Sequence, residues 1–249
     1  MAAPLIRDFS TRADNSIDKE KSKVKTKEIL DEIRDLQNLL FAENKHALLI
    51  ILQGMDASGK DGVIRNVFGA INPQGVQVKS FKAPTTEELS HDFLWRIHLH
   101  TPEKGMIKIF NRSHYEDILI TRVHGWCDDE LARKRVKAIN DWEDLVTNHN
   151  ATIILKFYLH ISFEEQQERL AERLSDPGKM WKHNPGDAIE AKLWDKYMTV
   201  YQDAFNNCNN IPWHIIPSDQ NWYKEFLIAE KVRDTLKSLK MAYPSLKSP

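Results

Sequence analysis

One seven-residue stretch restricts the fold of this chain more than any other: it runs from Gly54 to Lys60 and has the pattern G-x-x-x-x-G-K. It follows the continuous apolar run 47–52, which is typical of a strand buried on both faces, and it opens a helical pattern. In that context the backbone can curl so that its N–H groups face phosphate oxygens, and Lys60 adds a mobile positive charge. A chance glycine turn is the alternative, but the strand before the loop and the helix after it favour a phosphate-binding loop. The loop residues expected to contact phosphate or nucleotide are Gly54, Met55, Ala57, Ser58, Gly59 and Gly62.

The rest of the chain alternates between apolar strand patterns and amphipathic helical patterns. Strands are predicted at 47–52, 76–81, 106–110, 152–159 and 213–216, and helices at 23–42, after the loop, and at 86–100, 128–149, from Ser162, 187–207 and 222–240. This alternation predicts an α/β fold of the P-loop kinase kind, with a mostly parallel sheet sandwiched by helices. We expect a single domain over 23–249 with a helical lid at about 160–186, preceded by a polar arm over 1–22.

Charge and composition exclude several classes of protein. The formal net charge is −1, whereas proteins built to hold nucleic acid usually carry a strong basic excess. The cysteines Cys127 and Cys208 lie outside any metal-binding spacing, so they are expected to be reduced thiols. No apolar run approaches the roughly 20 residues that span a bilayer, and the N-terminus has no hydrophobic signal core. We therefore expect a cytoplasmic protein with neither nucleic-acid nor membrane partners.

Two carboxylates distinguish this phosphate loop from the usual pattern. Asp61 stands where a serine or threonine normally holds Mg²⁺, and Asp56 lies inside the loop. Both would repel a bare phosphate, but they suit a magnesium ion placed between the protein and its substrate. Asp61 as a simple helix cap is the alternative. The prediction is that Asp56 and Asp61 bind Mg²⁺, with Mn²⁺ as a substitute, and that both act in catalysis together with Lys60.

A second polar loop, 111–117, follows the third predicted strand. The carboxyl ends of such strands line the ligand crevice, so Arg112 is expected to clamp the transferring phosphoryl group and Asn111 to lie beside it. Glu116 is expected to assist the metal or orient the acceptor, and Arg122 to reach phosphate. For Glu116 and Asp117, complementing a helix dipole is the alternative. His114 is expected to pack or hydrogen-bond, because transfer between phosphates needs no strong base.

The predicted lid carries several cations. Arg169 and Arg173 are four residues apart, so they share one face of the helix that starts after Ser162, and Lys179 and Lys182 follow. We expect Arg169, Arg173 and Lys182 to close over the phosphates and exclude water. A solvated face is the alternative, because glutamates are interleaved with the arginines. A further basic run, 133–137, is read as solvated unless it lines a groove leading to Lys60.

Taken together, the loop 54–62 and the stretch 110–117 closely resemble the signature of the polyphosphate kinase 2 family. Segments 118–123 and 156–162 and the cluster of Arg169, Arg173, Trp181 and Lys182 are also similar, and the resemblance covers roughly residues 20–240. It implies polyphosphate-driven phosphorylation of nucleoside mono- or diphosphates with Mg²⁺, a thymidylate-kinase-like fold, and a homo-oligomer, either a dimer or a tetramer. The sequence most resembles the class III group, which accepts both AMP and ADP. Many members carry Asp where Asn111 stands, which leaves the metal more dependent on Asp56 and Asp61.

The leading hypothesis is thus a reversible polyphosphate:nucleotide phosphotransferase, since a two-carboxylate loop and clustered cations suit a metal-bridged polyanion. An ATP-dependent nucleoside or nucleotide kinase of the same fold is the alternative. A nucleotide-binding switch is a third reading, which the absence of an N-K-x-D motif weakens. The base, the chain length of the polyphosphate and the favoured direction are left open by the sequence.

Overall fold

The protein is built around a five-stranded sheet in the order β2-β3-β1-β4-β5, and every neighbouring pair is parallel. The computed structural model describes residues 5–245. The strands are β1 (Ala47–Gln53), β2 (Val76–Ser80), β3 (Ile107–Asn111), β4 (Thr152–His160) and β5 (Trp213–Pro217). All five strands lie within one or two residues of their predicted places, and the predicted α/β fold with a parallel sheet is confirmed.

The central strand β1 is buried throughout, which explains its continuous apolar sequence. Because side chains alternate between the faces of a strand, Leu49 and Ile51 join one hydrophobic cluster, while Leu48 and Ile50 join the other. The sheet therefore separates two cores. The phosphate loop follows β1 and the second polar loop follows β3, so both lie at the carboxyl edge of the sheet.

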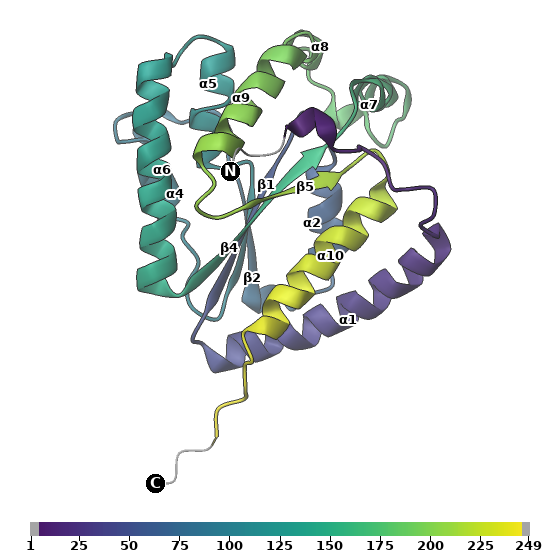
Figure 1. Ribbon diagram of the computed structural model, residues 1–249, viewed down its shortest axis with the longest axis vertical. Coiled ribbons are helices and arrows are strands. Elements are labelled where there is room, and N and C mark those ends of the chain that lie inside the picture. The colour runs from purple at the N-terminus through teal and green to yellow at the C-terminus, as the bar shows by residue number, and fades with distance from the viewer. Residues whose placement is uncertain (1–4, 246–249) are drawn as a thin grey trace.

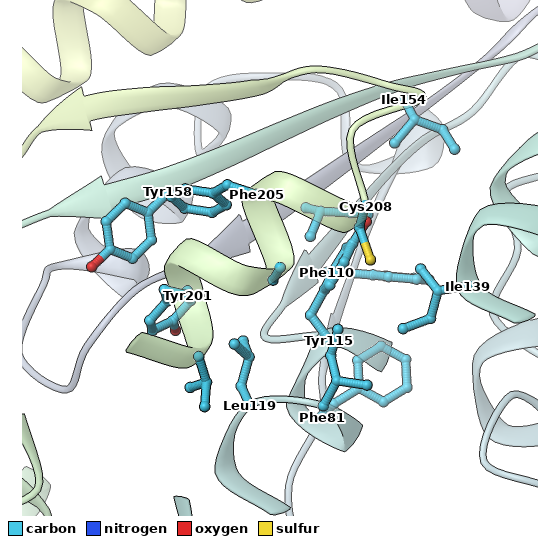
Figure 2. Packing of buried hydrophobic residues seen from close by; sticks show 14 of the residues in the cluster. Phe81, Phe110, Tyr115, Leu119, Ile139, Ile154, Tyr158, Tyr201, Phe205 and Cys208 are labelled. Carbon is cyan, nitrogen blue, oxygen red and sulfur yellow. The ribbon is translucent and has the colours of Figure 1, made fainter. Parts of the chain in front are cut away.

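Helices cover both faces of the sheet (Figure 1). On one face lie α6 (Asp129–Asn150) and α9 (Trp194–Asn207), whose apolar side chains join the cluster shown in Figure 2, among them Ile139, Tyr201 and Phe205. On the other face lie α1 (Lys19–Glu43), α2 (Lys60–Phe68) and α10 (Asn221–Ser238). The remaining helices are α3 (Thr86–Leu89), α4 (Trp95–His98), α5 (Ile120–Val123), α7 (Phe163–Ser175) and α8 (Asp187–Ala191), with 3-10 turns η1 (Ile6–Asp8), η2 (Pro73–Gly75), η3 (His114–Asp117) and η4 (Met180–Lys182).

Some helix boundaries differ from the prediction. The first helix begins at Lys19 rather than residue 23, because the Asp18 carboxylate accepts hydrogen bonds from the first backbone N–H groups. The helix predicted over 86–100 is two short helices, since the Asp92 side chain accepts from the N–H groups of Leu94 and Trp95 and so starts a new turn. The helix predicted over 187–207 is likewise divided into α8 and α9.

The segment before α1, predicted as a polar arm, packs against the domain from residue 5 onward. Ile6 is buried in the core and its N–H donates to the Gln202 side chain. The Thr11 hydroxyl donates to Asp219 just after β5. Residues 1–4 lie outside the described part. Over residues 5–245, none of the helices combines the length and apolar character needed to traverse a bilayer.

Candidate active site

The phosphate loop joins the end of β1 to the start of α2, as predicted. Two of its glycines have backbone conformations that side chains rarely adopt, with φ of 151° at Gly54 and 97° at Gly59. At Gly54 a Cβ atom would come within 2.9 Å of both the Leu159 carbonyl oxygen and the Ser58 hydroxyl. The loop can therefore curl this tightly only because glycine occupies these positions.

Lys60 is buried at the first position of α2 and turns back into the loop. Its Nζ donates to the carbonyl oxygens of Gly54 at 2.7 Å and Met55 at 3.1 Å. Burial, together with the nearby charge of Arg112, lowers the pKa of Lys60 to about 8. The lysine charge is thus held inside the curl of the loop, where phosphate oxygens would bind.

Arg112 links the phosphate loop to the second polar loop. It follows β3 directly, with the left-handed φ of 63°, and its guanidinium pairs with the carboxylates of Asp56 and Glu116, the latter at 3.1 Å. The charge of Glu116 raises the pKa of Arg112 despite burial. Burial alone would raise the pKa of Asp56, but the charges of Arg112 and Lys60 hold that pKa below its ordinary value. The three side chains therefore form a charged triad at the carboxyl ends of β1 and β3.

Asp61 does not cap α2, because Gly59 occupies the N-cap position and the helix has no side-chain cap. Its carboxylate instead accepts a 2.9 Å hydrogen bond from the Asn111 amide and lies 3.6 Å from Lys182 Nζ. The Asp61 side chain is 62% exposed at the cavity described next. The capping alternative is thereby wrong, and the Asp61 carboxylate faces the cavity.

A cavity of about 710 Å³ opens over the loop. Seven basic and five acidic side chains line it, so cations outnumber anions on its wall. The predicted site residues on its wall are Asp56, Ala57, Gly59, Lys60, Asp61, Gly62, Asn111, Arg112, Arg169, Arg173 and Lys182. A much smaller cavity adjoins it and is lined by Gly54, Met55, Asp56, Arg112, Glu116 and residues from α7, α8 and α9. Asp56 and Arg112 therefore lie between the two spaces.

The helix α7 brings the predicted lid arginines to the cavity, but the two are held differently. Arg173 pairs with Asp187 at 2.7 Å. Arg169 donates to the carbonyl oxygens of Ala57, Ser218 and Asp219 and pairs with Glu165. Arg169 thus contacts the backbone of the loop, whereas Arg173 has a single carboxylate partner that phosphate could replace.

Two predicted site residues, Arg122 and Ser58, line neither cavity. Arg122 pairs with Asp203 at 2.6 Å and with Asp129 at 2.8 Å, and it lines neither cavity. Ser58 is fully buried beneath the loop, with its hydroxyl 3.4 Å from Lys60 Nζ.

The donor set fits a magnesium ion that arrives with phosphate better than a resident ion. Mg²⁺ in phosphate sites is commonly held by one or two carboxylates together with substrate oxygens. Asp61 and Asp56 supply such carboxylates at the cavity, and within residues 5–245 no group of three or more His, Cys, Asp or Glu side chains could hold a metal by itself.

Sequence reasoning missed Lys224 and Gln166, which contact the loop from α10 and α7. The spacing of Lys224 could have indicated that it is buried: it precedes Ile228 by four residues and Val232 by eight, and both lie on the buried face of α10. A lysine on an apolar helix face requires a buried partner.

A buried polar network joins the second polar loop, 111–117, to β4 and α6. Lys156 on β4 donates to Glu143 on α6 and to the Tyr115 hydroxyl, each at 2.9 Å, and Tyr115 donates to Glu143 at 2.6 Å. His114 lies fully buried 3.5 Å from Glu143, and burial lowers the pKa of His114. Its position agrees with the predicted packing role.

The fold and the site define a P-loop phosphotransferase of the nucleotide-kinase type: a parallel sheet, a glycine loop before α2, and cations facing the loop from a later helix. Residues 16–244 match the family model described as Polyphosphate kinase 2. The chain belongs to the polyphosphate kinase 2 family.

Individual relatives agree with that membership. The chain is 46% identical over 214 residues to an AMP/ADP-polyphosphate phosphotransferase of Meiothermus ruber, covering 85% of this chain and 80% of the relative. It is 42% identical to an ADP-polyphosphate phosphotransferase of Rhodopseudomonas palustris, over 86% of this chain and 79% of the relative. The crystal structure of polyphosphate kinase 2 from Arthrobacter aurescens TC1 superimposes with a TM-score of 0.88 at 39% identity, over 100% of this chain and 95% of that one.

Proposed function

We propose that this protein reversibly transfers a phosphoryl group from inorganic polyphosphate to AMP or ADP. The observation that carries the proposal is the cation-rich cavity over a phosphate loop that bears two carboxylates, Asp56 and Asp61. Seven basic side chains around one cavity suit a polyanion that carries many charges, such as a phosphate chain. Membership of the polyphosphate kinase 2 family supports the same donor, and the relatives named above support AMP and ADP as acceptors.

In this proposal the larger cavity holds the phosphate chain, because the smaller one, of about 20 Å³, has room for little more than a water molecule. The chain lies in the larger cavity with its terminal phosphates against the N–H groups of the loop and Lys60. The acceptor phosphate approaches from the side of the smaller cavity, and Arg112, which lines both cavities, stabilises the charge on the phosphoryl group between donor and acceptor. Glu116 and Asp56 orient that guanidinium. The acceptor oxygen is already anionic, so no general base is required.

Magnesium, with manganese as a substitute, would be held by Asp61 and Asp56 and would neutralise charge on the bound phosphates. Arg173 and Lys182 exchange their carboxylate partners for phosphate oxygens when the lid closes and excludes water. We further propose a cytoplasmic homo-oligomer, either a dimer or a tetramer, without nucleic-acid or membrane partners.

The test is to incubate the pure protein with Mg²⁺, long-chain polyphosphate and either AMP or ADP, without ATP, and to separate the products. The proposal predicts ADP from AMP and ATP from ADP. If neither forms, but ATP phosphorylates a nucleoside or nucleotide, the protein is the ATP-dependent kinase instead.

A further inference from the structure

Every backbone carbonyl of the phosphate loop from residue 54 to residue 58 accepts a hydrogen bond from a side chain. Lys60 donates to the first two, as described above. The next three are held from outside the loop. Gln166 Nε2 donates to the Asp56 carbonyl oxygen at 3.1 Å, Arg169 to that of Ala57 at 2.9 Å, and Lys224 Nζ to that of Ser58 at 3.0 Å.

These three donors come from two helices that are distant in sequence. Gln166 and Arg169 lie one turn apart on α7, and Lys224 lies on the first turn of α10. Gln166 and Lys224 are almost completely buried, so each hydrogen bond is shielded from water. Such donors cannot be replaced by solvent, and leaving a buried carbonyl without a partner is costly.

Lys224 also explains the close fit at Gly59. A Cβ atom at Gly59 would lie 2.2 Å from Lys224 Nζ and 3.5 Å from the Arg169 guanidinium. The loop and the lysine therefore occupy directly adjoining space, and the second Nζ partner, Asn221 at 2.9 Å, fixes the direction of the ammonium group.

We propose that Gln166, Arg169 and Lys224 are positioning residues that hold the loop carbonyls outward and so keep its N–H groups directed at the phosphate chain. A peptide unit that rotated would present a carbonyl oxygen to the phosphates in place of an N–H donor. The three residues act through the loop backbone. For Arg169 this assigns a role different from the direct phosphate contact expected from its sequence.

The inference rests on the proposed function only in taking a phosphate chain as the ligand. The test measures the affinity of inorganic tripolyphosphate and, separately, of ATP for the full-length protein by calorimetry. The variants are Lys224→Met and Gln166→Leu, which remove one donor each from different helices. The matched controls are Lys231→Met, an exposed lysine two turns along α10, and Gln37→Leu, a fully buried glutamine on α1.

Each loop variant is expected to weaken tripolyphosphate binding about tenfold, the size of one well-formed hydrogen bond lost. For Lys224→Met, the KM for polyphosphate should rise in proportion while the KM for the acceptor nucleotide changes by less than about twofold, because Lys224 lines neither cavity. Gln166 lines the smaller cavity, so Gln166→Leu is judged by its tripolyphosphate affinity alone. The controls should leave both constants unchanged, and thermal unfolding should confirm that the variants are folded at the assay temperature.

Tripolyphosphate affinity equal to wild type in a folded Gln166→Leu or Lys224→Met variant would overturn the inference. Parallel rises in the KM of polyphosphate and of the acceptor nucleotide in Lys224→Met would also overturn it. If Lys224→Met does not fold, Gln166→Leu decides alone. A wild type that binds ATP but cannot use polyphosphate would refute the proposed function, and the effect of the variants on ATP affinity would still test the positioning role.

Discussion

At the level of single residues, the loop holds a buried lysine between two carboxylates with different surroundings. Asp56 is tied to Arg112, whereas Asp61 is exposed to the cavity beside Asn111 and Lys182. This arrangement separates two tasks. In the proposed function Asp56 orients the guanidinium that meets the phosphoryl group, and Asp61, the more exposed of the two carboxylates, is the better placed to hold a metal that arrives with the substrate.

Deprotonation of Lys60 should lower the activity at alkaline pH, which gives the pH profile of kcat/KM an alkaline limb. Lysine is charged below its pKa and neutral above it, and burial lowers the pKa of Lys60 to about 8. The value of kcat/KM for polyphosphate, which reports the free enzyme, should therefore fall as pH rises through about 8. Lys60→Ala should be slower by roughly 10²–10³-fold and lack this limb. A wild-type profile that is flat from pH 7 to about pH 9.5 would contradict this assignment.

Asp61→Asn should lose activity in a way that extra magnesium partly restores, because an amide is a weaker ligand than a carboxylate. We expect about a tenfold loss at limiting Mg²⁺ and a smaller loss at saturating Mg²⁺. Asp176→Asn is the control, since Asp176 also lines the cavity but lies beside Lys179 in the lid. Full activity of Asp61→Asn at limiting Mg²⁺ would exclude the metal role.

The residues of the loop could be predicted because their motif fixes both conformation and chemistry within seven positions. Lys224 and Gln166 could not, because their roles depend on how two later helices dock against the loop. Arg169 shows the same limit: its spacing from Arg173 placed both on one face, but only the docked helix shows that Arg169 reaches backbone carbonyls.

At the level of elements, α7 and the segment after it join the loop to the cavity rim. The first turns of α7 are hydrogen-bonded to the loop through Gln166 and Arg169, whereas residues 176–183 lie beyond those bonds and are exposed except for the half-buried Asp176 and Lys182. Motion of the predicted lid is therefore expected mainly after Arg173.

Polyphosphate should protect this part of the lid from proteolysis. Trypsin cleavage after Lys179 and Lys182 is expected to slow several-fold when polyphosphate and Mg²⁺ are bound, because both lysines line the cavity. Cleavage after Lys240, two residues beyond the end of α10, provides the control for inhibition of the protease itself. Equal slowing at all three sites, or none at Lys179, would count against closure.

The ends of the helices were harder to predict than the strands, because they depend on which side chains cap the first backbone N–H groups. The strands could be placed from their apolar runs because each is bounded by polar turns. The break between α3 and α4 depends on the Asp92 side chain accepting two backbone N–H groups, a local choice that helical periodicity does not reveal.

At the level of the whole molecule, the fold should be weakened by mild acid. Burial lowers the pKa of His214 to about 4, and it also lowers the pKa of His114 and His160. In the unfolded chain these histidines become protonated below about pH 6.5, whereas in the folded chain they stay neutral to lower pH. The free energy of unfolding should therefore fall between about pH 6.5 and about pH 4. Denaturant unfolding of His214→Gln should show a shallower fall. An unchanged slope would show that His214 does not contribute.

The central claim is that the phosphate loop takes its phosphoryl group from polyphosphate. Polyphosphate labelled with ³²P, incubated with Mg²⁺ and unlabelled AMP, tests this directly by following the label into nucleotide. We predict labelled ADP from the wild type, and formation at least about a hundredfold slower from a folded Lys60→Ala variant. Label appearing only as orthophosphate, or labelled ADP formed equally fast by Lys60→Ala, would contradict the claim.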